Sequence, residues 1–176
     1  MNFWDICGDL SNVIATALAA FSIFLAFAEQ KKAREYEKNR NIVEQKLLWY
    51  NEVVLNDIIK SLNEFVDEAR RRLDNVKGQE DDTTREKDLE KIYIIINDQY
   101  KSVREKVYLL KTFSIPLYKE CDDKLQNIFD LYSNAINEAT QKKRPPNISF
   151  YEIQRNKGDI FSALYKWAND FVEMGE

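Results

Sequence analysis

Few side chains in this 176-residue sequence are suited to acid–base or metal chemistry. Histidine, the commonest general base and metal ligand of proteins, does not occur in it. The two cysteines, Cys7 and Cys121, lie far apart, and neither has metal-ligand spacing around it. The acidic pairs Asp81–Asp82 and Asp122–Asp123 are adjacent, so their carboxylates point apart on a helix, and we interpret them as solvated surface. We therefore expect no enzyme, no metal and no cofactor.

One short string, Arg155-Asn156-Lys157-Gly158-Asp159-Ile160, stands out in the last predicted helix. It resembles the R-N-x-x-x-H motif of HEPN ribonucleases, which are small helical bundles that cleave RNA. Arg155 and Asn156 match that motif, but Ile160 occupies the histidine position and cannot exchange a proton. The resemblance implies an HEPN-like fold, and the isoleucine argues against cleavage. Alternatively, Arg155 and Asn156 are ordinary polar helix residues beside Gly158, whose presence a close approach of another helix would explain.

The segment Leu10–Ala28 (LSNVIATALAAFSIFLAFA) contains no charged residue over nineteen positions. As a helix it would be about 28 Å long, which matches the hydrocarbon core of a bilayer. A buried helix of a soluble protein is one alternative. A cleaved signal peptide is another, since Ala26-Phe27-Ala28 resembles a cleavage site. However, a signal peptide begins with basic residues, and here Asp5 and Asp9 precede the segment. The sequence therefore predicts a transmembrane helix.

The charges that flank this segment predict its orientation. No Lys or Arg precedes it, whereas five follow it closely: Lys31, Lys32, Arg34, Lys38 and Arg40. Because positively charged flanks stay in the cytoplasm, we expect residues 1–9 on the extracytoplasmic side of the membrane and residues 29–176 in the cytoplasm.

Small and weakly polar residues form one stripe of the predicted transmembrane helix, and a bulkier stripe follows Ile14, Leu18, Phe21 and Leu25. Small residues permit close approach of helices in lipid, so this stripe predicts self-association, and a pore if its polar members face water. The alternative is a plain anchor. The candidate pore-lining or association residues are Asn12, Ala15, Thr16, Ala19, Ser22 and Ala26.

The rest of the chain has the pattern of an all-α protein. Residues 29–46 are polar on nearly every face and predict a helical stalk that continues from the membrane helix. Four amphipathic stretches follow in residues 47–176, at about 47–76, 83–110, 117–139 and 149–175, and predict a four-helix bundle. Thr83, Ser114 and Ser149 are candidate helix caps. The net charge of −4 argues against a strongly basic nucleic-acid surface.

The combination of an N-terminal transmembrane helix, a helical bundle and Arg155-Asn156 resembles the small membrane accessory proteins of type VI-B CRISPR systems. That resemblance implies an oligomeric pore in the bacterial inner membrane, which permeabilises or depolarises the membrane and strengthens RNA-targeting antiphage defence. The implied partners are further copies of the chain, the lipid bilayer and an RNA-guided nuclease system or RNA. The alternative is a membrane-tethered module that binds RNA or a protein without catalysis.

Overall fold

The computed structural model describes residues 3–78 and 81–173, and it describes side chains for Ser22 and for residues 25–38, 40–78 and 81–171. All regular structure in these ranges is helical, which confirms the predicted all-α class. The elements are α1 (Phe3–Trp49), η1 (Tyr50–Leu55), α2 (Asn56–Lys77), α3 (Asp82–Tyr108), η2 (Leu109–Thr112), α4 (Ile115–Lys142) and α5 (Phe150–Glu173).

The chain divides into two units, residues 1–46 and 47–176. The first unit consists of one helix, because α1 runs without a break through residues 10–28 and on through residues 29–46. Its described side chains from Leu25 to Lys46 are exposed, except for the half-buried Val43. Within the part of the chain that is described, none of the helices combines the length and hydropathy that a bilayer crossing requires.

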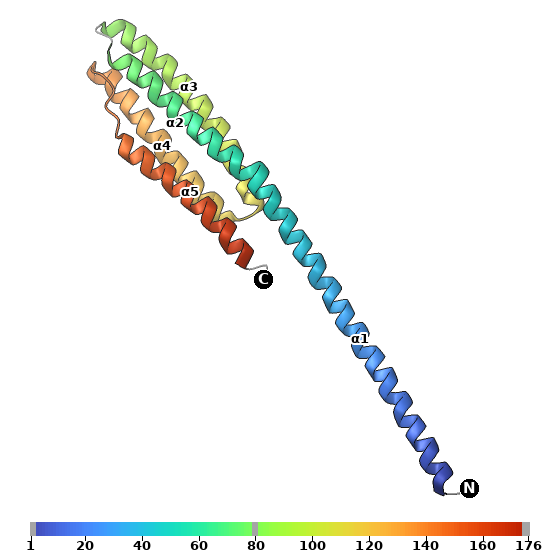
Figure 1. Ribbon diagram of the computed structural model, residues 1–176. Helices are drawn as coiled ribbons and strands as arrows, with labels where there is room; N and C mark the ends of the chain where they lie inside the picture. Colours follow the sequence, from blue (N-terminus) through green and yellow to red (C-terminus); the bar gives the residue numbers. More distant parts are fainter. Residues whose placement is uncertain (1–2, 79–80, 174–176) are drawn as a thin grey trace. The chain divides into compact units, whose positions relative to one another are not determined.

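The second unit is a bundle of α2, α3, α4 and α5 (Figure 1). Helix α3 packs against both α2 and α4, α4 packs against α5, and α2 makes a smaller contact with α5. Each helix buries one stripe of apolar residues, as the sequence predicts. The HEPN-like assignment of this bundle remains a prediction. The buried stripes include Ile58, Leu62 and Phe65 of α2; Ile92, Ile96 and Val103 of α3; Leu125, Ile128 and Tyr132 of α4; and Ile153, Ile160 and Leu164 of α5.

Polar side chains begin three of these helices by accepting hydrogen bonds from free backbone amides. The predicted cap Ser149 does so at the start of α5, with 3.4 Å between its Oγ and the amide nitrogen of Glu152. Ser114 caps α4 as predicted, with 3.3 Å between its Oγ and the amide nitrogen of Leu117. The predicted cap of α3, Thr83, is wrong. Asp81 takes that role, because its carboxylate lies 2.9 Å from the amide nitrogen of Thr84. At the other end of α4, Lys143 adopts a left-handed conformation (φ 48°) that terminates the helix.

An aromatic cluster lies at one end of the bundle, around the short π-helix η1. Tyr50 of η1 is fully buried in it. The Tyr50 hydroxyl donates a hydrogen bond to the backbone oxygen of Leu164 in α5, at 2.9 Å. The Tyr50 ring contacts Phe113 and Trp167, with ring centroids 5.2 and 4.6 Å away. This one side chain therefore ties the start of the bundle to α5 through both its ring and its hydroxyl.

Replacing Tyr50 by Phe should lower the free energy of unfolding by about 1 kcal/mol, because the hydrogen bond to Leu164 is lost while the ring remains. Urea denaturation of the purified chain would measure the change. Tyr151→Phe is the matched control, since the Tyr151 side chain is 77% exposed. Equal stabilities of the Tyr50→Phe chain and the unchanged chain would contradict the role assigned to this hydroxyl.

Candidate functional site on the bundle

The predicted pore-lining residues lie mostly outside the part of the structure in which side chains are described. Asn12, Ala15, Thr16 and Ala19 fall on the helical backbone of α1, but their side chains are not among those described. Ser22 and Ala26 are described, and both are exposed. The association stripe thus stays a prediction.

The three residues of the HEPN-like string occupy different environments on α5. Ile160 is fully buried in the bundle core. Arg155 is exposed, and it lies about 140° around the helix from Ile160. Asn156 is half-buried and donates a hydrogen bond to the backbone oxygen of Glu152, at 2.9 Å. Within one chain, therefore, the fold does not bring Arg155 and Ile160 together.

Arg155 and Asn156 instead border a polar groove between α4 and α5, which we call the α4–α5 groove. Its volume is about 330 Å³, and side chains of both helices line it. Lys124 spans its edge and pairs with Asp159 of α5 at 2.7 Å, and hydrogen bonding to that ammonium lowers the pKa of Asp159. Amide, guanidinium and ammonium groups suit the groove for binding polar or anionic groups. The other α4 residues that line it include Asn127, Asp130, Leu131 and Asn134.

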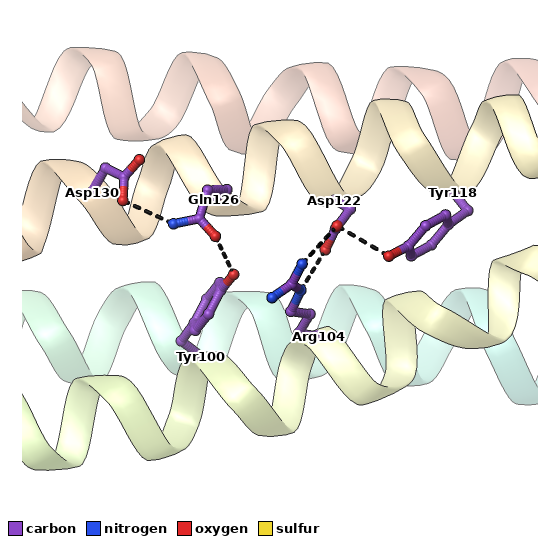
Figure 2. Close-up of polar contacts among 6 residues, drawn as sticks. All are labelled: Tyr100, Arg104, Tyr118, Asp122, Gln126 and Asp130. Atoms are coloured by element: carbon purple, nitrogen blue, oxygen red, sulfur yellow. Dashed lines mark hydrogen bonds and ion pairs between the residues drawn. The ribbon is translucent and has the colours of Figure 1, made fainter.

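A second polar constellation, the α3–α4 clasp, joins α3 to α4 (Figure 2). The Arg104 guanidinium donates two hydrogen bonds to the Asp122 carboxylate, with Nε at 2.8 Å and Nη2 at 3.0 Å. The Tyr118 hydroxyl donates a third, at 3.1 Å. The Asp122 side chain is 15% exposed, so its interpretation as solvated surface is wrong. Its neighbour Asp123 is exposed, as predicted.

The pKa of the Asp122 carboxyl follows from this geometry. Burial acts to raise it, but the hydrogen bonds from Arg104 and Tyr118 outweigh burial and hold the pKa below its ordinary value. The same contact raises the pKa of Arg104. Asp122 is thus ionised and fully engaged, which makes it a structural acceptor rather than a general base.

The hydrogen bonds of the α3–α4 clasp continue along α4, one helical turn beyond Asp122 at Gln126 and two turns beyond it at Asp130. The buried Tyr100 donates its hydroxyl hydrogen to Gln126, whose Nε2 in turn donates to Asp130 at 2.8 Å (Figure 2). The Tyr100 ring stacks on Phe129, with centroids 4.3 Å apart. The sequence contains a pattern that could have predicted the α4 side of the α3–α4 clasp. Its polar residues recur at every fourth position, at Tyr118, Asp122, Gln126 and Asp130.

Two basic clusters of the sequence, Arg70–Arg72 and Lys142–Arg144, are partly neutralised by neighbouring acids. Arg71 and Arg72 both pair with Glu68, at 2.7 and 2.6 Å, and Arg70 pairs with Asp74 at 3.7 Å. At the end of α4, Lys142 and Arg144 share Glu138, at 3.3 and 2.7 Å. These arginines and lysines therefore form solvated ion pairs, as expected of surface charge runs.

Neither a metal centre nor a reactive thiol emerges from the described residues. No group of three or more acidic, cysteine or histidine side chains among them could hold a metal ion. Cys121 is fully buried in α4, and burial raises the pKa of its thiol to about 12. A buried, protonated thiol of this kind is inert.

Comparison with known proteins identifies no relative. No protein-family model matches the chain, and no curated protein or solved structure is significantly similar to it.

Removing the Asp122 charge should destabilise the bundle in a pH-dependent way. Asp122→Asn should lower the free energy of unfolding by about 1 kcal/mol at pH 7. Because the folded pKa of Asp122 is depressed, the stabilisation is fully present above about pH 4, the ordinary carboxyl pKa, and is lost as pH falls through the lower folded value. Urea titrations at several pH values would follow the difference.

The exposed neighbour provides the control, since Asp123→Asn should change stability by less than about 0.5 kcal/mol at any pH. A gap between the Asp122→Asn chain and the unchanged chain that stays constant down to the lowest pH would rule out the ionised clasp.

Proposed function

We propose that this chain is a membrane-anchored, self-associating protein whose α1 helices line a pore that permeabilises the bacterial inner membrane. The observation that carries the proposal is the continuity of α1. This single helix of 47 residues contains the uncharged segment Leu10–Ala28 and then the polar stretch 29–46. A single helix thus joins an apolar segment, whose length suits a bilayer, to a polar segment that suits water.

The exposure of large apolar side chains on α1 supports association with lipid or with other copies. Leu25 is 45% exposed and Phe27 is 66% exposed. A helix that exposes such residues to water is stabilised when a bilayer or another helix covers them. Lipid would cover the bulky stripe of the segment. Neighbouring copies would cover the small apolar members of the other stripe, such as Ala15 and Ala19, and its polar members Asn12 and Thr16 would face the lumen.

The polar stretch of α1 is compatible with a hydrated assembly. Between Glu29 and Lys46 the sequence carries six basic and four acidic residues, and no face of the helix is apolar. The basic residues include those next to the apolar segment, which favours the cytoplasmic side for this stretch and for the bundle. A helix of this kind is stable where water reaches all of its faces.

We also propose that the pore acts in antiphage defence. The support is the resemblance in layout to the membrane accessory proteins of type VI-B CRISPR systems, together with the all-helical bundle that follows α1. In this proposal an RNA-guided nuclease system controls opening of the pore, and the chain itself contributes no catalysis.

Substitutions in the predicted lumen should separate conduction from assembly. Replacing Asn12 and Thr16 together by Leu should reduce depolarisation of expressing cells at least several-fold, because water is excluded from an apolar lumen. A potential-sensitive dye would report the effect, and protection against phage beside an RNA-targeting effector should fall in parallel. Light scattering of the detergent-solubilised chain should still give a closed oligomer.

Ile14→Leu, a conservative change in the bulky stripe, is the control and should leave depolarisation unchanged. A detergent-solubilised chain that is monomeric, or a double variant that depolarises cells fully, would remove the pore proposal.

A second candidate function, a membrane-tethered binding module, is favoured by the α4–α5 groove. Its exposed Arg155 and its amide side chains offer hydrogen-bond donors to RNA or to a protein partner.

Exchange of the membrane segment distinguishes the two functions. Replacing residues 10–28 by an unrelated apolar transmembrane helix should abolish depolarisation and protection if α1 lines a pore. A tethered module would keep full protection after the same exchange, since the helix then serves only to localise the bundle. Membrane fractionation controls for equal insertion of the two chains.

A further inference from the structure

The side of α1 that carries the candidate pore-lining stripe continues beyond the apolar segment. Helix α1 runs unbroken from Phe3 to Trp49, and successive residues of an α-helix lie about 100° apart around its axis. By this geometry Glu37 lies at the centre of the stripe's side, and Glu44 lies about 20° from Glu37. The stripe residues, all within about 60° of Glu37, are Asn12, Ala15, Thr16, Ala19, Ser22 and Ala26.

Charge is distributed unequally around the polar stretch 29–46. Within about 40° of Glu37 this stretch has only Gln30, Ala33, Asn41 and Glu44, none of which is basic. All four of its lysines lie about 100° or more from Glu37, in the half of the helix that also carries the bulky stripe. The stretch is therefore acidic on the side of the small residues and basic on the other. The exposed lysines are Lys31, Lys32, Lys38 and Lys46.

The two arginines of the stretch lie at the edges of the acidic side, about 60° to either side of Glu37. Arg40 is already engaged, since its Nε lies 2.9 Å from the Glu44 carboxylate. Glu37 is exposed and makes no ion pair with any described residue of the chain. The carboxylate at the centre of the acidic side is thus left without a partner in the single chain.

We propose that Glu37 and Glu44 of neighbouring copies form rings of carboxylates at the cytoplasmic mouth of the pore, and that these rings select small cations such as K⁺ over anions. The inference rests on the proposed pore and names what it conducts. Rings of acidic side chains are a general means of cation selection in channels. A charge acts over about 8 Å at physiological ionic strength, so such a ring controls a lumen of comparable radius.

The two carboxylates contribute unequally to the negative potential of the mouth. Glu44 shares its charge with Arg40, whereas Glu37 is uncompensated. Each further copy in the ring adds another Glu37, and the repulsion between these like charges falls when a cation enters. Glu37 is therefore the residue on which selectivity depends most.

The basic side of α1 suits contact with the membrane surface. Lys31 and Lys32 follow the apolar segment directly, and their long side chains could reach anionic lipid head groups around the pore. The same helix can thus keep a basic cytoplasmic flank without placing ammonium groups in the conduction path.

The opposite arrangement, an anion pathway lined by these lysines, conflicts with the membrane segment. Turning the lysines inward would also turn Leu18 and Leu25 toward water, and it would turn Asn12 toward the acyl chains. Exposure of apolar groups to water and of an amide to lipid both cost free energy.

The permeability ratio of K⁺ to Cl⁻ tests the proposal. It follows from the reversal potential of the full-length chain in a planar bilayer that separates two KCl concentrations. We expect a ratio of about fivefold or more in favour of K⁺. Glu37→Gln should lower the ratio by about half or more, and Glu37→Lys should bring it below one, because the ring then becomes positive.

Glu35→Gln is the matched control. It removes the same charge two positions away, but Glu35 lies about 160° around the helix from Glu37, on the basic side. The permeability ratio should therefore stay unchanged. Equal effects of Glu35→Gln and Glu37→Gln would overturn the proposal, since net charge and not position would then set selectivity.

Modification of introduced cysteines gives a readout that misfolding cannot imitate, because the same channels are recorded before and after the reagent. In a Cys7→Ser background the remaining thiol, Cys121, is buried. A cationic methanethiosulfonate reagent should reduce the K⁺ current of Glu37→Cys by about threefold or more and leave that of Glu35→Cys unchanged. A labelled Glu37→Cys chain with an unchanged current would overturn the proposal.

The pore and its selectivity can fail separately. Absence of current from the unchanged chain removes the pore, and the carboxylate rings with it. A current that shows no preference for K⁺, or a preference for Cl⁻, removes only the carboxylate rings.

Discussion

Each helix of the bundle buries one stripe of apolar side chains, and the packing of these four stripes against each other holds residues 47–176 together. Isolated helices of this length are marginal in water, so their stability comes from packing. Ile58, Ile96, Ile128 and Ile160, one from each helix, are all fully buried. Once these faces meet, the direction of every remaining side chain is set by its angle from the stripe.

This constraint explains why the residues of the HEPN-like string lie on different faces of α5 and do not form one site. Ile160 belongs to the apolar stripe of α5 and is therefore committed to the core. Arg155 lies away from that stripe and points to solvent, beside the α4–α5 groove. The same rotation places Gly158 and the exposed Tyr151 and Tyr165 on the face of α5 opposite the core. One helix thus serves the core with one face and exposes the other.

The sequence predicts the bundle well, because periodic apolar residues and caps act locally. In the predicted stretches 83–110 and 117–139, apolar residues at helical spacing such as Leu89, Ile96 and Ile136 are buried. Leu48, in the first predicted stretch, is instead 57% exposed. What the sequence does not predict are contacts that depend on the register between helices. The Arg104–Asp122 pair joins two helices, and the Tyr50 contact with Leu164 joins residues 114 positions apart. No local pattern encodes such distances. The association predicted for the stripe of α1 that begins at Asn12 would involve neighbouring molecules, which a single chain does not contain.

The polar network of the bundle is insensitive to protons near neutrality. Every resolved shift in pKa moves away from neutral pH: the carboxyls become stronger acids, while the phenols and the thiol become weaker ones. These groups therefore keep one protonation state across the physiological range, so their ion pairs and hydrogen bonds do not rearrange on mild acidification. The groups are Glu68, Asp81, Asp122, Glu138 and Asp159 among the carboxyls, and Tyr50, Tyr100, Tyr132, Cys121 and Arg104, whose pKa is raised, among the others.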